Sequence, residues 1–275
     1  MARVRQPAVA GAFYDADPDV LRRHVDSLLD QARGATVKGS IKGLVSPHAG
    51  YMYSGSTAAV GYRLLRGKSY DAVILVGPSH REFFTGASIY PGDSYRTPLG
   101  DVPVHKEMRD ELVKEGGTIM LSDAGHRGEH CLEVQLPFLQ RVLGEFSIVP
   151  IIIGNQRREF CLALGNALAK AASRRNVLLV ASSDLSHYHP YDEAVKLDRQ
   201  VIGLVEALDE KTMMDQIEEE QIEACGGGPV VSVMHAAKLL GANRSQVLFY
   251  CNSGDVTGDK DAVVGYLSAA FLQVN

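Results

Sequence analysis

Apolar residues along the chain occur in two patterns, as short continuous runs and as stretches with helical spacing. Each of five runs has the length of a buried strand and is preceded or followed by a helix-like stretch. This alternation predicts an α/β fold with a mostly parallel central sheet flanked by helices. The strands are expected at residues 41–45, 71–76, 147–153, 176–181 and 246–250, and the helices at 17–33, 55–66, 105–115, 129–143, 158–173, 191–207, 210–220 and 229–240.

Three further segments complete this pattern. Asp17 and Pro18 form an N-cap and a first helical position, a combination typical of a helix start. Residues 86–104 are rich in turn-forming residues and predict an antiparallel excursion, and residues 262–271 predict a last strand. Since no Pro- or Gly-rich linker divides the sequence, we expect a single domain over residues 1–275.

The composition argues against several classes of protein, including membrane-spanning and disulfide-rich proteins. The chain has 275 residues, of which 45% are hydrophobic, and a net charge of -5, which gives no general attraction for nucleic acid or anionic membranes. No apolar run approaches the roughly 18 residues of a spanning helix, and no signal peptide is recognisable. The four cysteines form no C-x-x-C pair, so neither a disulfide framework nor a structural zinc site is predicted. We expect a cytoplasmic protein.

Polar side chains follow four of the predicted strands. His48 follows the first strand, His80 the second, and Asp184 and His187 the fourth, while residues 251–255 follow the last. Histidine is not a helix-capping residue, so local propensity does not explain this distribution. In a parallel sheet the carboxyl ends of the strands share one edge, where ligands bind. The sequence therefore predicts a binding site at this edge.

The residue types at this edge favour a metal site. Two or three imidazoles with one anionic ligand suit a single Fe, Cu, Zn or Ni ion. A carboxylate as the third ligand favours Fe(II) oxygen chemistry, whereas a thiolate raises the affinity for copper. Cys225 is a candidate thiolate because a helix is expected to begin near it, and a helix N-terminus lowers a thiol pKa. A small apolar residue beside a glycine cap explains Cys225 equally well.

The segment around His130 has two interpretations. Glu129, His130 and Glu133 stand at the start of the helix expected at 129–143, where acidic residues complement the helix dipole. His130 either has no special role, or it lines the pocket or supports a metal ligand.

Three other patterns are weaker. The sequence ACGGGPV lacks the Lys-Ser/Thr of a P-loop and the spacing of G-x-G-x-x-G, so no nucleotide cofactor is predicted. Residues 254–261 contain three aspartates without the glutamate of an EF-hand loop. A Ser-His-Asp hydrolase is disfavoured because the sequence has no G-x-S-x-G elbow.

Six motifs, in order along the chain, resemble those of the Memo family, in particular its prokaryotic branch, AmmeMemoRadiSam system protein B. They are VSPHAGYMYSG, VGPSH, EHCLEVQLPFL, SSDLSHYHPY, ACGGGP and SGDVTGDKDAVVGY. The resemblance extends from QPAVAGAFYDADP to VVGYLSAAF, which is nearly the whole chain. It implies a fold similar to that of class III extradiol dioxygenases (LigB-like).

The resemblance also implies roles for individual residues. His48 and His80 match the two family histidines that bind the metal, and Cys225 matches the cysteine that replaces the dioxygenase carboxylate. Asp184 and His187 match other pocket residues, with His187 at the position of the dioxygenase acid/base.

His130 lies in a further family motif, which strengthens its case as a catalytic pocket residue. Family members bind iron or copper, so the resemblance implies one Fe(II) or Cu ion per chain and a redox or oxygenase-like activity on a small substrate. The name of the prokaryotic branch implies radical S-adenosylmethionine and AMMECR-type protein partners. Two alternatives stay open. One is a non-catalytic protein whose pocket binds a phosphate, a carboxylate or a peptide, and the other is a zinc-dependent hydrolase.

Overall fold

The computed structural model describes residues 2–32 and 36–274. The strands are β1 (Val4–Arg5), β2 (Ser40–Ser46), β3 (Ala72–Pro78), β4 (Ala87–Ile89), β5 (Ser94–Thr97), β6 (Gly100–Pro103), β7 (Ile119–Leu121), β8 (Ile148–Ile153), β9 (Val177–Ser182), β10 (Asp184–His189), β11 (Arg244–Asn252) and β12 (Val263–Gln273). The helices are α1 (Pro18–Gln31), α2 (Tyr51–Arg63), α3 (Lys106–Lys114), a 3-10 helix (Glu133–Gln135), α4 (Leu136–Val142), α5 (Arg158–Ala172), α6 (Tyr191–Glu206), α7 (Glu210–Glu218), α8 (Gly227–Leu239) and α9 (Ser253–Thr257).

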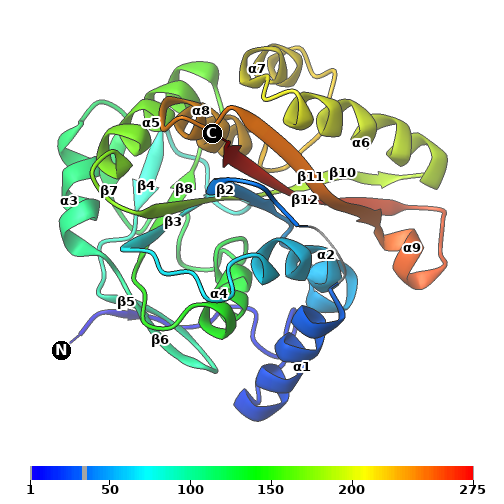
Figure 1. Ribbon diagram of the computed structural model, residues 1–275, viewed down its shortest axis with the longest axis horizontal. Coiled ribbons are helices and arrows are strands. Elements are labelled where there is room, and N and C mark those ends of the chain that lie inside the picture. Colours follow the sequence, from blue (N-terminus) through cyan, green and yellow to red (C-terminus); the bar gives the residue numbers. More distant parts are fainter. Residues whose placement is uncertain (1, 33–35, 275) are drawn as a thin grey trace.

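Nine strands within the described residues form the main sheet. Its order is β10-β12-β2-β9-β3-β8-β4-β7, and β11 pairs with the other side of β12. The four central strands β2, β9, β3 and β8 run parallel, whereas β12 and β4 are antiparallel to their neighbours β2 and β8. Helices cover both faces (Figure 1). The predicted α/β fold with a central sheet is confirmed, and its outer strands make the sheet mixed.

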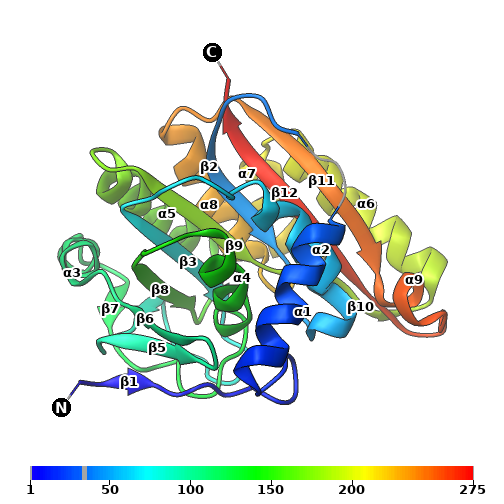
Figure 2. The same cartoon turned by 60° about the horizontal axis from the view of Figure 1, so that its bottom comes forward.

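Alternate residues of the central strands pack into two separate core layers. In β3, Val73 and Leu75 pack with α1, α2 and α4, while Ile74 and Val76 pack with α5 and α8 on the opposite face. Figure 2 shows α1, α2 and α4 together on one side of the sheet. Burial on both faces explains why these strands have continuous apolar sequences rather than alternating ones.

The helix boundaries follow local hydrogen bonding. The Asp17 carboxylate accepts the amide N–H groups of Asp19 and Val20 and caps α1, as predicted. The predicted last residue of this helix, Arg33, lies outside the described residues. At α3, the His105 side chain accepts the N–H of Met108, so histidine does cap a helix in this chain, contrary to expectation.

In two segments the structure differs from the sequence-based prediction. The helix expected at 129–143 begins only at Glu133, with a 3-10 turn, because the amides of His130 and Cys131 donate to the carboxylate of Glu129 instead. The polar segment after β9, where no strand was predicted, forms the strand β10, which pairs antiparallel with β12 through two register shifts. In contrast, the antiparallel excursion at 86–104 is confirmed by the β5–β6 pair.

The carboxyl ends of four strands meet at one edge of the sheet. β2, β3 and β9 are parallel, and β11 runs in the direction of β2 because both are antiparallel to β12. β10 continues beyond β2 along the same side of β12, and the N–H of Ser183 donates to the carbonyl of Ser46 at 3.0 Å. Among the described helices, none is long and apolar enough to cross a bilayer.

Candidate metal centre

Three side chains at this edge form a compact donor group. His48 follows β2, His80 follows β3, and Cys225 stands just before α8. One ligand atom from each of the three lies within 4.8 Å of the others. His48 is fully buried, whereas the side chain of His80 remains 30% exposed. The group therefore extends from the protein interior towards solvent.

The hydrogen bonds of His48 fix which ring nitrogen carries the proton. The Ser182 hydroxyl donates to the carbonyl of Cys131 at 2.7 Å and accepts the side-chain amide of Gln135 at 3.0 Å. Since its single proton is used, this hydroxyl must accept from His48 Nδ1, which lies 2.9 Å away. The lone pair of His48 is therefore on Nε2, which lies 3.1 Å from Cys225 Sγ.

His80 is oriented by a buried carboxylate. Glu129 accepts both the backbone N–H of His80 at 2.8 Å and its Nδ1–H at 2.9 Å. Burial opposes ionisation of Glu129, but the hydrogen bonds that it accepts from His80 are stronger and hold its pKa well below the usual range. His80 thus keeps Nε2 free, and a carboxylate behind a ligating histidine is a common arrangement at metal sites.

The environment of Cys225 differs from the expectation. Its thiol was predicted to have a lowered pKa, yet burial and the nearby carboxyl of Asp184 raise the pKa. The prediction failed because Cys225 precedes the N-cap residue Gly226, and burial outweighs the helix dipole. Cys225 Sγ accepts the backbone N–H of Asp184 at 3.3 Å. A metal ion bound here would displace the thiol proton.

Asp184 lies beside the donor group. Its Oδ1 accepts the backbone N–H of His48 at 2.7 Å, and its Oδ2 lies 4.0 Å from His48 Nε2. Burial raises the pKa of this carboxyl to about 7.

Two more histidines line the same cavity, which has a volume of about 720 Å³. The ring of His130 packs against those of His80 and His48, with centroids 4.8 and 5.3 Å away. Burial lowers the pKa of His130 to about 4, and it also lowers the pKa of His187. Both imidazoles are therefore neutral at pH 7. Of the six predicted site residues, five line the cavity and the sixth, Cys225, contacts His48.

The mouth of the cavity is largely apolar and aromatic, with one acidic residue, Asp259. Met52 and Tyr188 line it although they are 68% and 75% exposed, and Phe13 and Tyr266 add apolar surface. Tyr188 has a φ of 61°, in the left-handed region that non-glycine residues rarely adopt, at a register shift of β10. Among the lining residues that the structure describes, none is Lys or Arg.

Comparison with known proteins places the chain in a family. The sequence model of the family described as Memo-like protein matches residues 5–270. The chain belongs to the Memo family. A MEMO1 family protein of Methanothermobacter thermautotrophicus is 39% identical over 272 residues, covering 96% of this chain and 98% of that protein. A MEMO1 family protein of Sulfolobus acidocaldarius is 40% identical over 282 residues, covering 98% of this chain and 99% of the relative.

A solved structure supports the fold of this Memo-family chain. The crystal structure of an uncharacterized protein from Escherichia coli K12 aligns with a TM-score of 0.59 and 15% sequence identity. The alignment covers 84% of this chain and all of the other. The mixed α/β architecture agrees with the LigB-like fold expected from the sequence.

Sequence reasoning missed the residues that orient the histidines of this Memo-family site. Glu129 had been interpreted only as a dipole complement, and Ser182 and Gln135 had no assigned role. Glu129 is 49 residues from His80, and Ser182 is 134 residues from His48. No sequence pattern could have found these pairs, because the fold alone brings them together.

A second donor group overlaps the first but is less suited to a metal. It consists of His80, Glu129 and Cys131. The carboxylate of Glu129 already accepts four N–H groups, from His80, His130 and Cys131. The buried Cys131 thiol donates to the carbonyl of Pro78 at 3.3 Å. These atoms are satisfied by the protein itself, so the group acts as a support for His80.

Proposed function

We propose that the chain binds one Fe or Cu ion through His48, His80 and Cys225 and catalyses a metal-dependent oxidation of a small organic substrate. The observation that carries this proposal is the fixed tautomer of the two histidines. Ser182 and Glu129 hold the Nδ1–H groups, which leaves two Nε2 lone pairs beside one thiol. Two imidazoles and a thiolate form a donor set that suits Cu and Fe better than hard cations.

The residues around the donor group fit this chemistry. A bound Fe or Cu ion would supply electron transfer and a binding position for dioxygen or substrate. His187 is neutral at pH 7 and faces the cavity, so it can accept a proton from a substrate hydroxyl or thiol. Asp184 holds the backbone of His48 and places a carboxyl next to the donor group. His130 shields the two ligating histidines from bulk water.

The composition of the cavity favours a neutral substrate over an anionic ligand. A phosphate or carboxylate would meet Asp184 and Asp259 in the wall, with no Lys or Arg among the described lining residues to pair with it. Placing like charges together in a partly dehydrated cavity is unfavourable. This disfavours the alternative of an anion-binding adaptor. The proposed partnership with radical S-adenosylmethionine and AMMECR-type proteins is compatible with either role.

Anaerobic purification followed by elemental analysis tests the proposal. We expect close to one Fe or Cu per chain in the wild type, after reconstitution with Fe(II) or Cu(I) where needed, and its loss in His48→Ala and Cys225→Ala. His24→Ala and Cys161→Ala are matched controls because both residues lie outside the cavity. Absence of bound metal after reconstitution with Fe(II), Cu(I) or Zn(II) would overturn the proposal, and binding of Zn alone would favour hydrolysis.

Activity is tested next with the loaded protein. Oxygen consumption with catechol-like and thiol substrates should exceed that of the His48→Ala variant. A cytoplasmic location also follows from the proposal, because all four cysteines are free thiols and a thiol-containing site is best preserved in a reducing compartment.

A further inference from the structure

The N-terminal segment, residues 4–14, is anchored to the turn that carries Glu129 and His130. The guanidinium of Arg5 donates to the carbonyl of His126 at 2.7 Å and to the carbonyl of Glu129. It also donates to the carboxylate of Glu133 at 2.6 Å. The Arg5 side chain thus binds three acceptors within eight residues, 126–133. The planar guanidinium suits this role because its N–H groups point in fixed directions.

Glu133 also binds the N-terminal segment directly. Its carboxylate accepts the backbone N–H groups of Ala8 and Val9 at 2.7 and 3.0 Å, and the Tyr14 hydroxyl at 2.5 Å. The side chains of Arg5 and Glu133 are 4% and 0% exposed. Removing either partner would leave an uncompensated buried charge, so the pair is costly to disturb.

The contacts of Arg5 and Glu133 are connected to the candidate metal centre through Glu129. Arg5 holds the carbonyl of Glu129, and the carboxylate of that residue sets the Nδ1–H tautomer of His80. The segment also supplies part of the cavity wall, since Phe13 packs on His130 with ring centroids 4.9 Å apart. The carbonyl of Phe13 accepts the N–H of Tyr51 at 2.7 Å, which ties the same segment to the start of α2.

We propose that Arg5 and Glu133 are positioning residues for the metal centre, which fix the turn at residues 126–133 so that Glu129 orients His80. The inference rests on the proposed metal role of His80. It differs from a general stabilising role because it requires that disturbing Arg5 changes the tautomer of His80, which the carboxylate of Glu129 sets.

The test compares metal affinity with the state of His80 in the metal-free protein. Anaerobic titration with Co²⁺ gives the dissociation constant, and ¹⁵N–¹H spectra of the histidine side chains give the tautomer of His80, assigned with His80→Gln. Arg5→Lys keeps the positive charge but removes the planar guanidinium that reaches three acceptors. Glu133→Gln removes the negative charge with little change in the shape of the side chain. Arg22→Ala is the control, since Arg22 forms an exposed ion pair with Asp19 in α1.

We expect Arg5→Lys and Glu133→Gln to weaken Co²⁺ binding about 10- to 100-fold, as the loss of an outer partner of a ligand does. The His80 spectrum should show a mixture of tautomers, and Arg22→Ala should match the wild type. If either main variant is unfolded, Tyr14→Phe decides the question, because it removes one hydrogen bond from Glu133 and should weaken Co²⁺ binding about threefold.

Folded variants with a lower melting temperature but an unchanged His80 tautomer and Co²⁺ affinity would overturn the inference. A wild-type protein that binds no Co²⁺ would instead count against the proposed metal role. In that case the His80 tautomer of the metal-free variants still decides whether Arg5 and Glu133 position this side chain.

Discussion

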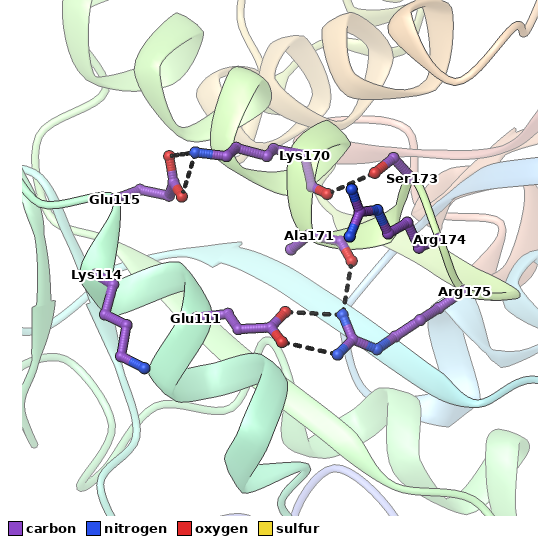
Figure 3. A pocket seen from close by; sticks show the side chains of 8 residues that line it. All are labelled: Glu111, Lys114, Glu115, Lys170, Ala171, Ser173, Arg174 and Arg175. Carbon is purple, nitrogen blue, oxygen red and sulfur yellow. Dashed lines mark hydrogen bonds and ion pairs between the residues drawn. The ribbon is translucent and has the colours of Figure 1, made fainter.

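The two edges of the central sheet carry hollows of opposite character. At the amino edge, between the C-terminal ends of α3 and α5, a hollow of about 550 Å³ is lined by charged side chains (Figure 3). Its ion pairs join Glu115 to Lys170 and Glu111 to Arg175, and all four side chains remain at least partly exposed to solvent. At the carboxyl edge the polar groups are mostly buried, and two of them, Ser182 and Glu129, each have several hydrogen-bond partners.

The two edges therefore differ in how closely they position individual polar atoms. The pairs in Figure 3 lie at the surface in contact with water, so their charges are screened and individually replaceable. At the carboxyl edge, the Ser182 hydroxyl forms hydrogen bonds with Gln135, Cys131 and His48. The carboxylate of Glu129 accepts four N–H groups. Such a network occupies the Nδ1 atoms of His48 and His80 and leaves their Nε2 atoms beside the Cys225 thiol, an arrangement that suits a metal site.

The substitution Cys225→Ser should produce the largest effect, because it removes a ligand and not merely a support. We expect a loss of Co²⁺ affinity of at least about 100-fold, beyond the 10- to 100-fold typical of an outer partner. The thiolate-to-Co²⁺ absorption band should also disappear. Cys161→Ser in α5 should retain both properties. Binding by Cys225→Ser within threefold of the wild type would remove Cys225 from the ligand set.

The substitution Glu129→Gln should have the next largest effect. It keeps the size of the side chain but replaces the charged acceptor of His80 Nδ1–H, so the metal affinity should fall about 10- to 100-fold. Competition with a coloured chelator measures the change. An affinity equal to that of the wild type would mean that the carboxylate does not tune His80.

The pH dependence of stability tests a buried histidine near the carboxyl edge but outside the donor group. Burial lowers the pKa of His126 to about 3, and Tyr95 and the carbonyl of Ser88 occupy its ring nitrogens. The unfolded chain therefore binds the extra proton between about pH 6.5 and pH 3, and the free energy of unfolding falls as the pH is lowered through this range.

The contribution of this one residue is at most about 1.4 kcal/mol per pH unit. Urea unfolding at several pH values should show a shallower decline for His126→Asn than for the wild type. Equal slopes in the two proteins would assign the acid sensitivity to other groups.

The smallest effect is expected at the amino edge. Lys170→Ala breaks an exposed ion pair with Glu115, and the free energy of unfolding should change by less than about 1 kcal/mol. Metal binding should not change at all. A clear loss of metal affinity in this variant would contradict the assignment of the chemistry to the other edge.

The sequence predicted the parts of the fold that depend on local pattern. Continuous apolar runs identified β3 and β8 because both faces of these strands are buried, and the position of His48 and His80 after strand ends placed them at one edge. The strand β10 could not be predicted from its polar sequence, because its pairing with β12 depends on residues far along the chain. The sign of the Cys225 pKa shift was wrong for a similar reason, since burial is a property of the folded molecule.

The separation of the interacting residues along the chain also has a consequence for how the protein is made. Cys225 lies 177 residues after His48, and Glu133 lies 128 residues after Arg5. During synthesis the N-terminal partners emerge first and must wait for most of the chain before these contacts can form. Contacts between such distant residues also make folding slow. The proposed ion would therefore enter its site only after most of the chain has been made, and it would not serve as an early template for folding.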